Sequence, residues 1–586
     1  MKSKLTLVVY SVLIFVAYAK VAGPNVILMV TDDAGWGDYG ATGNTLFKTP
    51  HLDAMAKASG SMDTFYVSPV CSPTRACLMT GRYNYRTRCI DTWLGRSMLE
   101  PEEVTIAEVM KTEGYATGIF GKWHLGDCYP MRPHDQGFDE ALVHLGGGLA
   151  QPSEPLENER RYTDPILFRN GVPEQTKGFC TDVYFDGALE FIGKQKKAGK
   201  PFFIYLPTNA PHGPYHDVPA EWLAYYQKQD LTPLMVHQPK GAKREQQIDT
   251  LNRVAAMVSN FDDNVGRLMK ALRSQGLEKD TIVIYIDDNG PNSMRYVGKF
   301  RGMKTHVHEG GVRSPCWVYA PGRVKAGLAR PELAAHIDLM PTILEACGIG
   351  VPKALELDGI SFWHLLRGGR KAWPDRQVII QSHRGNHPVK YHHFMIRQGD
   401  WKLLHASGFG KSNFEGAPKF ELYNLADDPG EKTNLAHKEP ERFRQLKAAY
   451  EDWFSEVGAE DPQNYTPPVI TIGSDHEATT HLTRQDWRGD NWSPRGKGSW
   501  LLGQLEADTY EVRVVLHPDT VSEKPIQMRL IAGGLVLNGS LPPNTGDFKF
   551  EGVTLPAGKF NLAVILKEEG REDWGPLHVQ LTCMSK

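Results

Sequence analysis

Short runs of apolar residues that end in polar clusters recur along the first half of the chain. They occupy residues 26–30, 118–120, 202–206 and 282–286. Continuous apolar runs of this length are typical of strands that are buried on both faces. Between them, apolar residues at mostly three- and four-residue spacing predict a long helix over residues 248–272 and a shorter one over 336–347. This alternation predicts an α/β fold, a mostly parallel sheet sandwiched by helices.

The polar clusters that follow these runs are candidates for a functional site. In chain order they contain Asp32 and Asp33, Lys122 and His124, His212, and Asp288 and Asn289. Ligands of such sheets bind beyond the carboxyl ends of the strands, so we expect the clusters to meet at one edge. Core packing explains the apolar runs, but it does not explain why each run stops at side chains of this kind.

The N-terminus has the pattern of a secretory signal peptide over residues 1–19. Lys2 and Lys4 precede an apolar run over residues 5–17, and Ala17-Tyr18-Ala19 fits a small-x-small cleavage site. The run is shorter than the roughly 20 apolar residues that span a bilayer, and no later stretch is long enough. The sequence therefore predicts a secreted or periplasmic protein with no stable membrane anchor.

Composition excludes several classes of protein. The chain has 586 residues, 66 basic and 69 acidic side chains, and a formal charge of −3. This balance provides no electrostatic surface for nucleic acid, so we expect no nucleic-acid partner. Eight cysteines in a chain of this length are too few for a disulfide scaffold.

Residues 71–82 read CSPTRACLMTGR. This segment resembles the signature of the formylglycine-dependent, type I sulfatases of the alkaline phosphatase superfamily: C-x-P-x-R, four residues, then T-G-R. Every fixed position matches, and the resemblance extends over about residues 24–455. It implies an alkaline phosphatase-like fold, and it implies that a maturation enzyme converts Cys71 to formylglycine, whose hydrated form is the nucleophile. Pro73 favours a helix start, and helix N-termini attract anions. Arg75 would hold the oxygens of the nucleophile or the sulfate.

Asp32, Asp33, Asp288 and Asn289 form a candidate metal site. Three carboxylates at one edge repel one another unless a cation lies between them. All four side chains offer oxygen, which suits calcium or magnesium and argues against zinc. The alternative is that the aspartate pair only caps the next helix. The resemblance implies one Ca²⁺ ion held by these four residues, with the formylglycine at Cys71 completing the shell.

Further segments match sulfatase blocks. They are residues 121–126, GKWHLG, and residues 301–304, RGMK, which EGGVRSP follows at 309–315. The resemblance implies that Lys122 and Lys304 bind sulfate oxygens and that His124 supports the nucleophile and helps to eliminate sulfate. It leaves open whether His212 or Lys304 protonates the leaving alcohol.

The resemblance and the texture of the sequence together predict three domains after the signal peptide. A catalytic α/β domain covers residues 20–387, and a small antiparallel C-terminal subdomain covers 388–460. After a proline-containing linker, alternating segments between turn residues predict an appended β-sandwich-like domain over 469–586. The sandwich either binds carbohydrate or packs against the core.

The predicted function is hydrolysis of sulfate esters, with a sulfated polysaccharide or oligosaccharide as substrate. A phosphonate or phosphodiester hydrolase of the same superfamily is an alternative, because a tetrahedral phosphoryl group fits a similar site. A carbohydrate-binding protein with a vestigial site is another, although all the charged site residues are present.

Overall fold

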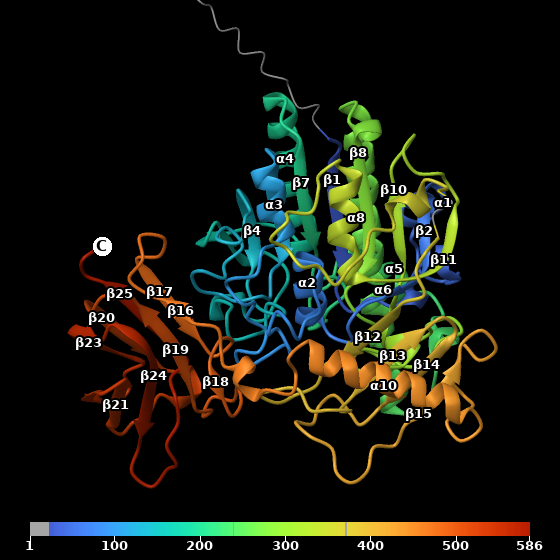
Figure 1. Ribbon diagram of the computed structural model, residues 1–586. Helices are drawn as coiled ribbons and strands as arrows, with labels where there is room; N and C mark the ends of the chain where they lie inside the picture. Colours follow the sequence, from blue (N-terminus) through green and yellow to red (C-terminus); the bar gives the residue numbers. More distant parts are fainter. Residues whose placement is uncertain (1–22, 238, 370–371) are drawn as a thin grey trace, which may run out of the picture.

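The computed structural model describes residues 23–237, 239–369 and 372–586. The predicted signal peptide, residues 1–19, lies outside these described residues. Within them, no helix combines the length and the apolar character that a membrane span requires. Figure 1 shows an α/β domain with a smaller sheet beneath it and, to one side, a β-sandwich formed by the last part of the chain.

The central sheet of the α/β domain is mostly parallel. In sheet order its strands are β11 (Ala329–Ala335), β2 (Gly60–Tyr66), β10 (Cys316–Tyr319), β8 (Thr281–Asp287), β1 (Asn25–Thr31), β7 (Phe202–Pro207), β3 (Ala116–Lys122), β4 (Glu140–His144), β5 (Ile166–Arg169) and β6 (Val172–Gln175), and β9 (Arg313–Ser314) pairs with β2. The four predicted strands are the adjacent parallel strands β8, β1, β7 and β3, and all of their residues are buried. The antiparallel members include β10 and β5.

Helices cover both faces of this sheet. Successive side chains of a strand point to opposite faces, so each buried strand contributes to two separate cores. Ile27 and Met29 of β1 share a core with α1 (Pro50–Ala58), α4 (Cys180–Ala198), α5 (Ala220–Tyr226) and α6 (Ala242–Ser274). Val26, Leu28 and Val30 share the other core with α2 (Cys71–Thr80), α3 (Ile106–Thr112), α8 (Leu339–Ala346) and α9 (Trp363–Leu366). The long and short helices predicted from periodicity are α6 and α8.

A second, antiparallel sheet packs beside the first. Its strands are β12 (Gln377–Gln381), β13 (Phe394–Gln398), β14 (Trp401–His405) and β15 (Glu421–Asn424), and helix α10 (Pro440–Glu456) packs against it. Strand β12 precedes residue 388, so this sheet begins inside the range predicted for the α/β domain. The apolar run in β12 has the pattern of any buried strand, and only its pairing with β13 assigns it to the second sheet.

The C-terminal residues form a β-sandwich, as their alternating pattern predicts. One sheet contains β16 (Ile470–Thr471), β19 (Gly498–Gln504), β24 (Gly558–Lys567), β21 (Ile526–Ala532) and β22 (Leu535–Leu541), with β18 (Arg488–Gly489) beside β19. The other contains β17 (Thr479–Thr483), β25 (His578–Cys583), β20 (Asp508–Val515) and β23 (Asp547–Leu555). The sandwich core also includes Leu94, Met98, Cys128 and Met131 of the α/β domain. The two parts therefore share buried apolar surface.

Candidate active site

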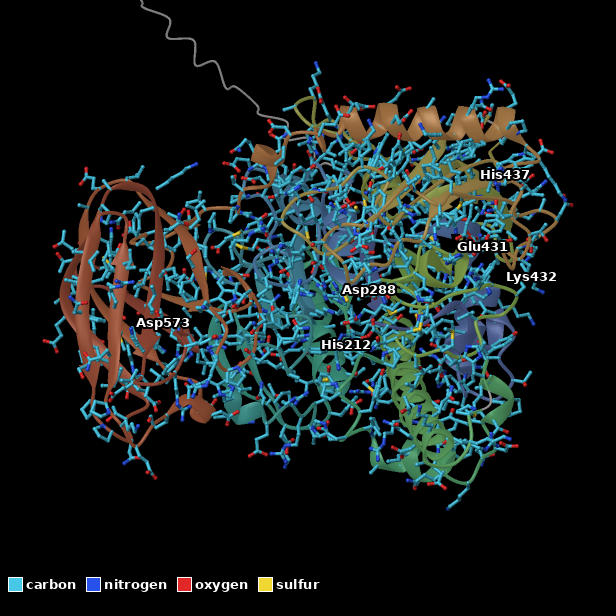
Figure 2. The ribbon with its side chains drawn as sticks, turned by 90° about the horizontal axis from the view of Figure 1, so that it is seen from below. His212, Asp288, Glu431, Lys432, His437 and Asp573 are labelled. Atoms are coloured by element: carbon cyan, nitrogen blue, oxygen red, sulfur yellow. The ribbon has the colours of Figure 1, made fainter. Side chains whose placement is uncertain are left out.

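The predicted polar clusters meet at the carboxyl edge of the central sheet. Asp32 and Asp33 follow β1, and Asp288 follows the neighbouring strand β8. The register pairs Thr31 of β1 with Asp287 of β8, so the two strands end side by side. The backbone N–H of Asp33 donates to Asp288 Oδ1 at 3.3 Å. Figure 2 shows His212, which follows β7, and Asp288 in the middle of the α/β domain.

Cys71 is the first residue of helix α2, with Val70 at the N-cap, so the thiol lies in the first turn of the helix. It is buried, and its Sγ lies 3.5 Å from Asp32 Oδ1. Burial and the neighbouring Asp32 carboxylate raise the pKa of the Cys71 thiol to about 12. The unmodified side chain is therefore a protonated thiol at neutral pH.

Three cations meet the three carboxylates. Arg75 Nη2 lies 2.8 Å from Asp288 Oδ2, and Arg75 Nη1 donates to the Lys122 carbonyl at 3.1 Å. Lys122 Nζ lies 2.5 Å from Asp32 Oδ2, and Lys304 Nζ lies 2.5 Å from Asp33 Oδ1. Lys304 comes from the loop between β8 and α7 (Glu309–Val312). The site thus brings together every charged side chain that the sequence assigns to it.

Burial sets the protonation of the carboxylates. It raises the pKa of Asp288 to about 6, together with the charge of Asp32. For Asp33, burial acts in the same direction, but the charges of Lys304 and His212 outweigh it and lower the pKa below its ordinary value. Asp33 is therefore ionised at neutral pH, as a carboxylate that binds a metal ion must be.

The oxygen atoms of this cluster fit a hard cation. The side chains of Asp32, Asp33, Cys71 and Asp288 each place a potential ligand atom within 4.8 Å of the others. Asp33 Oδ2 and Asn289 Oδ1 are buried without a hydrogen-bond partner, which costs free energy unless a ligand satisfies them. The capping alternative fails, because the N-cap of the following 3₁₀ helix is Gly35.

Two histidines flank the cluster. The carbonyl of Thr92 accepts a hydrogen bond from His124 Nε2 at 2.9 Å, and the pKa of His124 is held well below its ordinary value by burial and then by the charges of Lys122 and Arg75. His212 donates through Nδ1 to the Gly213 carbonyl at 2.5 Å, and its Nε2 lies 3.6 Å from Asp33 Oδ2. Burial is the main reason that the pKa of His212 falls to about 3.

The site opens on the side of His212 and Lys304. Their side chains are 16% and 12% exposed, whereas those of Asp32, Asp33, Arg75 and Lys122 are fully buried. A cavity of about 780 Å³ is lined by Thr305, the residue after Lys304, and by Arg295, whose Nη2 donates to the Asp33 carbonyl at 3.0 Å. The cavity is also lined by Lys299, Arg301, His306, His308, His393, Phe409, Glu421 and Lys432. Basic side chains therefore outnumber acidic ones around it.

One contact to the site comes from a residue that sequence reasoning missed. Gln485 of the β-sandwich is buried, and its Nε2 lies 3.3 Å from His124 Nε2. The sequence does not predict this contact. Gln485 lies far along the chain from every catalytic block, and only the packing of the sandwich brings it to His124.

Comparison with known proteins identifies the family. The family model described as sulfatase matches residues 24–349. The chain belongs to the sulfatase family. It is a sulfuric ester hydrolase, as the signature at Cys71 predicts. A second model, described as N-sulphoglucosamine sulphohydrolase, C-terminal, matches residues 300–456 of this sulfatase.

Relatives and solved structures agree with this assignment. Human N-acetylgalactosamine-6-sulfatase is 28% identical over 520 residues, which cover 81% of this chain and 90% of that protein. Human arylsulfatase A is 30% identical over 468 residues, which cover 72% of this chain and 86% of that protein. The crystal structure of Ps i-CgsB in complex with k-i-k-neocarrahexaose superposes with a TM-score of 0.63 at 26% identity, covering 76% and 94% of the two chains. The predicted alkaline phosphatase-like fold is thereby confirmed.

Proposed function

We propose that this sulfatase hydrolyses sulfate esters of a sulfated glycan with a formylglycine nucleophile made from Cys71 and one bound Ca²⁺ ion. The observation that carries the proposal is the convergence of Cys71 with three aspartates and Asn289, whose oxygens include two that are buried without a partner. When present, these two groups supply an oxygen nucleophile and a Lewis acid at the same point. Asp32, Asp33, Asp288 and Asn289 would hold the ion.

The protein's own cations bind and orient the sulfate group. Arg75 is fixed by Asp288 and by the Lys122 carbonyl, so its guanidinium is positioned before substrate arrives. Lys122 contacts Asp32 and Lys304 contacts Asp33, so the two ammonium groups can donate to separate sulfate oxygens. Donors fixed in a site from which water is excluded stabilise charge that develops in the transition state.

Proton transfers fall to the residues around this cluster. His124 is neutral and has one ring nitrogen, Nδ1, without a hydrogen-bond partner, so it is available to take a proton from the nucleophile. His212 and Lys304 border the open side, where the leaving alcohol departs, and both remain candidates for the residue that protonates it.

A sulfated sugar chain fits the surroundings of the site. The cavity lined by Thr305, the residue after Lys304, has room for a neighbouring sugar, and its lysine and arginine side chains suit an anionic one. The similar proteins include enzymes named N-acetylgalactosamine-6-sulfatase, and one solved structure is a complex with k-i-k-neocarrahexaose. With the predicted signal peptide, the proposal places the enzyme outside the cytoplasm, in the periplasm or secreted.

Mass spectrometry and paired assays test the proposal. In active enzyme, the peptide containing Cys71 should have lost sulfur and two hydrogens and gained one oxygen, as the conversion of CH₂SH to CHO requires. Cys71→Ser should abolish turnover wherever cysteine is the residue that maturation converts. A control, Cys77→Ser, changes a cysteine that heads no motif. Full activity with an unmodified Cys71 thiol would refute the nucleophile.

Substrate class needs a second assay. Free sulfate should be released from an aryl sulfate and from defined sulfated oligosaccharides, with little phosphate from matched phosphate mono- and diesters. Higher kcat/KM on the phosphodiester would favour the alternative hydrolase. Release of sulfate from the aryl ester alone would remove the glycan from the proposal.

A further inference from the structure

The β-sandwich reaches the active site through the segment between β17 and β18, on the side of the sandwich that faces the α/β domain (Figure 1). Gln485 lies in this segment and is 1% exposed. Its Nε2 donates to the Thr92 carbonyl at 3.3 Å and to Ser97 Oγ at 3.2 Å, and it touches His124 Nε2 at 3.3 Å. One side chain of the sandwich therefore meets both His124 and the group to which His124 is hydrogen-bonded.

The Thr92 carbonyl fixes the tautomer of His124. A carbonyl oxygen only accepts hydrogen bonds, so the contact with Thr92 requires the proton of the neutral ring to be on Nε2. Nδ1 then carries the lone pair, and it is the ring nitrogen without a partner. The Thr92 carbonyl has two lone pairs, one for His124 and one for Gln485. Rotating the Gln485 amide by half a turn would set two carbonyl oxygens against each other.

The same segment holds the loops that carry Thr92 and His124. The backbone N–H of Gly95 donates to the Gln485 carbonyl at 2.7 Å, and that of Asp127 donates to Asp486 Oδ2 at 2.8 Å. His124 itself has a φ of 59°, a conformation that a non-glycine residue keeps only when its surroundings impose it. The sandwich is thus part of the frame that imposes it.

Packing alone does not account for an amide at this position. Gln485 Oε1 is buried without a hydrogen-bond partner, which costs free energy compared with an apolar side chain of similar shape. The two N–H groups of the amide, by contrast, are directed at the Thr92 carbonyl and at Ser97 Oγ.

We propose that the β-sandwich completes the active site of this sulfatase, and that Gln485 is a positioning residue: by donating to the Thr92 carbonyl it holds the acceptor of His124 Nε2–H and so keeps the unprotonated Nδ1 of His124 available as a base. The inference rests on the proposed function for its effect on rate, but the tautomer can be measured without turnover. On this proposal the β-sandwich supplies a residue of the active site and is part of the catalytic unit.

The test uses full-length enzyme with Gln485→Met, which keeps the size of the side chain and removes its donors. The matched control is Gln504→Met, which removes a buried glutamine of the same sandwich that bonds only to sandwich groups, the carbonyls of Leu555 and Pro556 and the hydroxyl of Tyr510. On an aryl sulfate, Gln485→Met should lower kcat about 10- to 100-fold with KM within about twofold, as loss of an orienting partner does. Gln504→Met should leave kcat per folded molecule within about twofold.

Nitrogen NMR of ¹⁵N-histidine-labelled protein supplies the second readout, with the signal of His124 assigned from His124→Gln. Wild type should show Nε2–H alone, and Gln485→Met a mixture of tautomers. An unchanged tautomer, or an equal fall of kcat in both glutamine variants, would overturn the proposal. If Gln485→Met does not fold, Gln485→Asn, whose amide is one methylene short, must still lower kcat. A wild type with the Nε2–H tautomer but no sulfatase activity would refute the proposed function instead.

Discussion

Lys402 is the centre of a buried ionic cluster that holds the second sheet against the active-site loop, and its removal has a large predicted cost. Its Nζ lies 3.0 Å from Glu309 Oε1 and 2.9 Å from Glu431 Oε1, and all three side chains are essentially inaccessible to water. Arg313 also pairs with Glu309, at 2.6 Å. Glu309 opens helix α7, shortly after Lys304.

The magnitude follows from these distances. At an effective dielectric constant of about 20, each contact of Lys402 contributes about 5 to 6 kcal/mol of attraction, which the desolvation of the ammonium group partly offsets. Lys402→Met leaves Glu431 buried without its ion-pair partner. We expect the free energy of unfolding to fall by about 3 to 5 kcal/mol, the usual cost of breaking a buried pair from one side.

Equilibrium denaturation by urea, followed by tryptophan fluorescence, measures the change. The control is Lys447→Met, which removes the partly exposed pair with Glu451 on α10 and should cost less than about 1 kcal/mol. A loss for Lys402→Met that is no larger than that of the control would refute the reasoning.

The pH dependence of the same variant gives an independent check. Burial opposes ionisation of Glu309, but Lys402, Arg313 and Arg397 outweigh it and lower the pKa of Glu309 below its ordinary value of 4.5. A carboxyl whose pKa is lowered by folding stabilises the protein above its unfolded pKa, and this stability is lost as pH falls through the folded value. Lys402→Met weakens that shift. Burial raises the pKa of Glu431, and loss of Lys402 removes the charge that opposes this rise. The difference in stability between wild type and variant should therefore narrow as pH falls and both carboxyl groups become protonated.

Three more predictions concern the site. Asp33→Asn and Asp288→Asn should each lose bound Ca²⁺ and turnover, because each removes an anionic ligand, and elemental analysis that finds full calcium would contradict this. For a series of aryl sulfates, kcat should fall as the pKa of the leaving alcohol rises. The variant that lacks the general acid, either His212→Ala or Lys304→Ala, should show a steeper fall than wild type, and unchanged slopes in both variants would exclude both residues. Deletion of residues 469–586 should lower the melting temperature and harm aryl sulfate and polymer hydrolysis alike, because the deleted part shares its core with the α/β domain. Unimpaired hydrolysis of the aryl ester by the truncated chain would show that the sandwich is dispensable.

The sequence by itself determined the α/β class and most of the site. Apolar runs and helical periodicity depend on which side chains can be buried, so they predict β1, β3, β7 and β8 without any information on tertiary contacts. The metal candidates directly follow β1 and β8, because neighbouring parallel strands present their carboxyl ends at one edge. The signature at Cys71 then connected that edge to sulfatase chemistry.

Tertiary structure decided what local pattern does not encode. Strand β12 has the same apolar pattern as a strand of the central sheet, and its hydrogen bonds to β13 alone place it in the second sheet. The alternating strands after residue 469 predicted a sandwich, but not that Leu94 and Met131 would enter its core or that Gln485 would meet His124. The contacts between the sandwich and the α/β domain join residues hundreds of positions apart. They depend on the shapes of two packed surfaces, and residue spacing along the chain contains no information on those shapes.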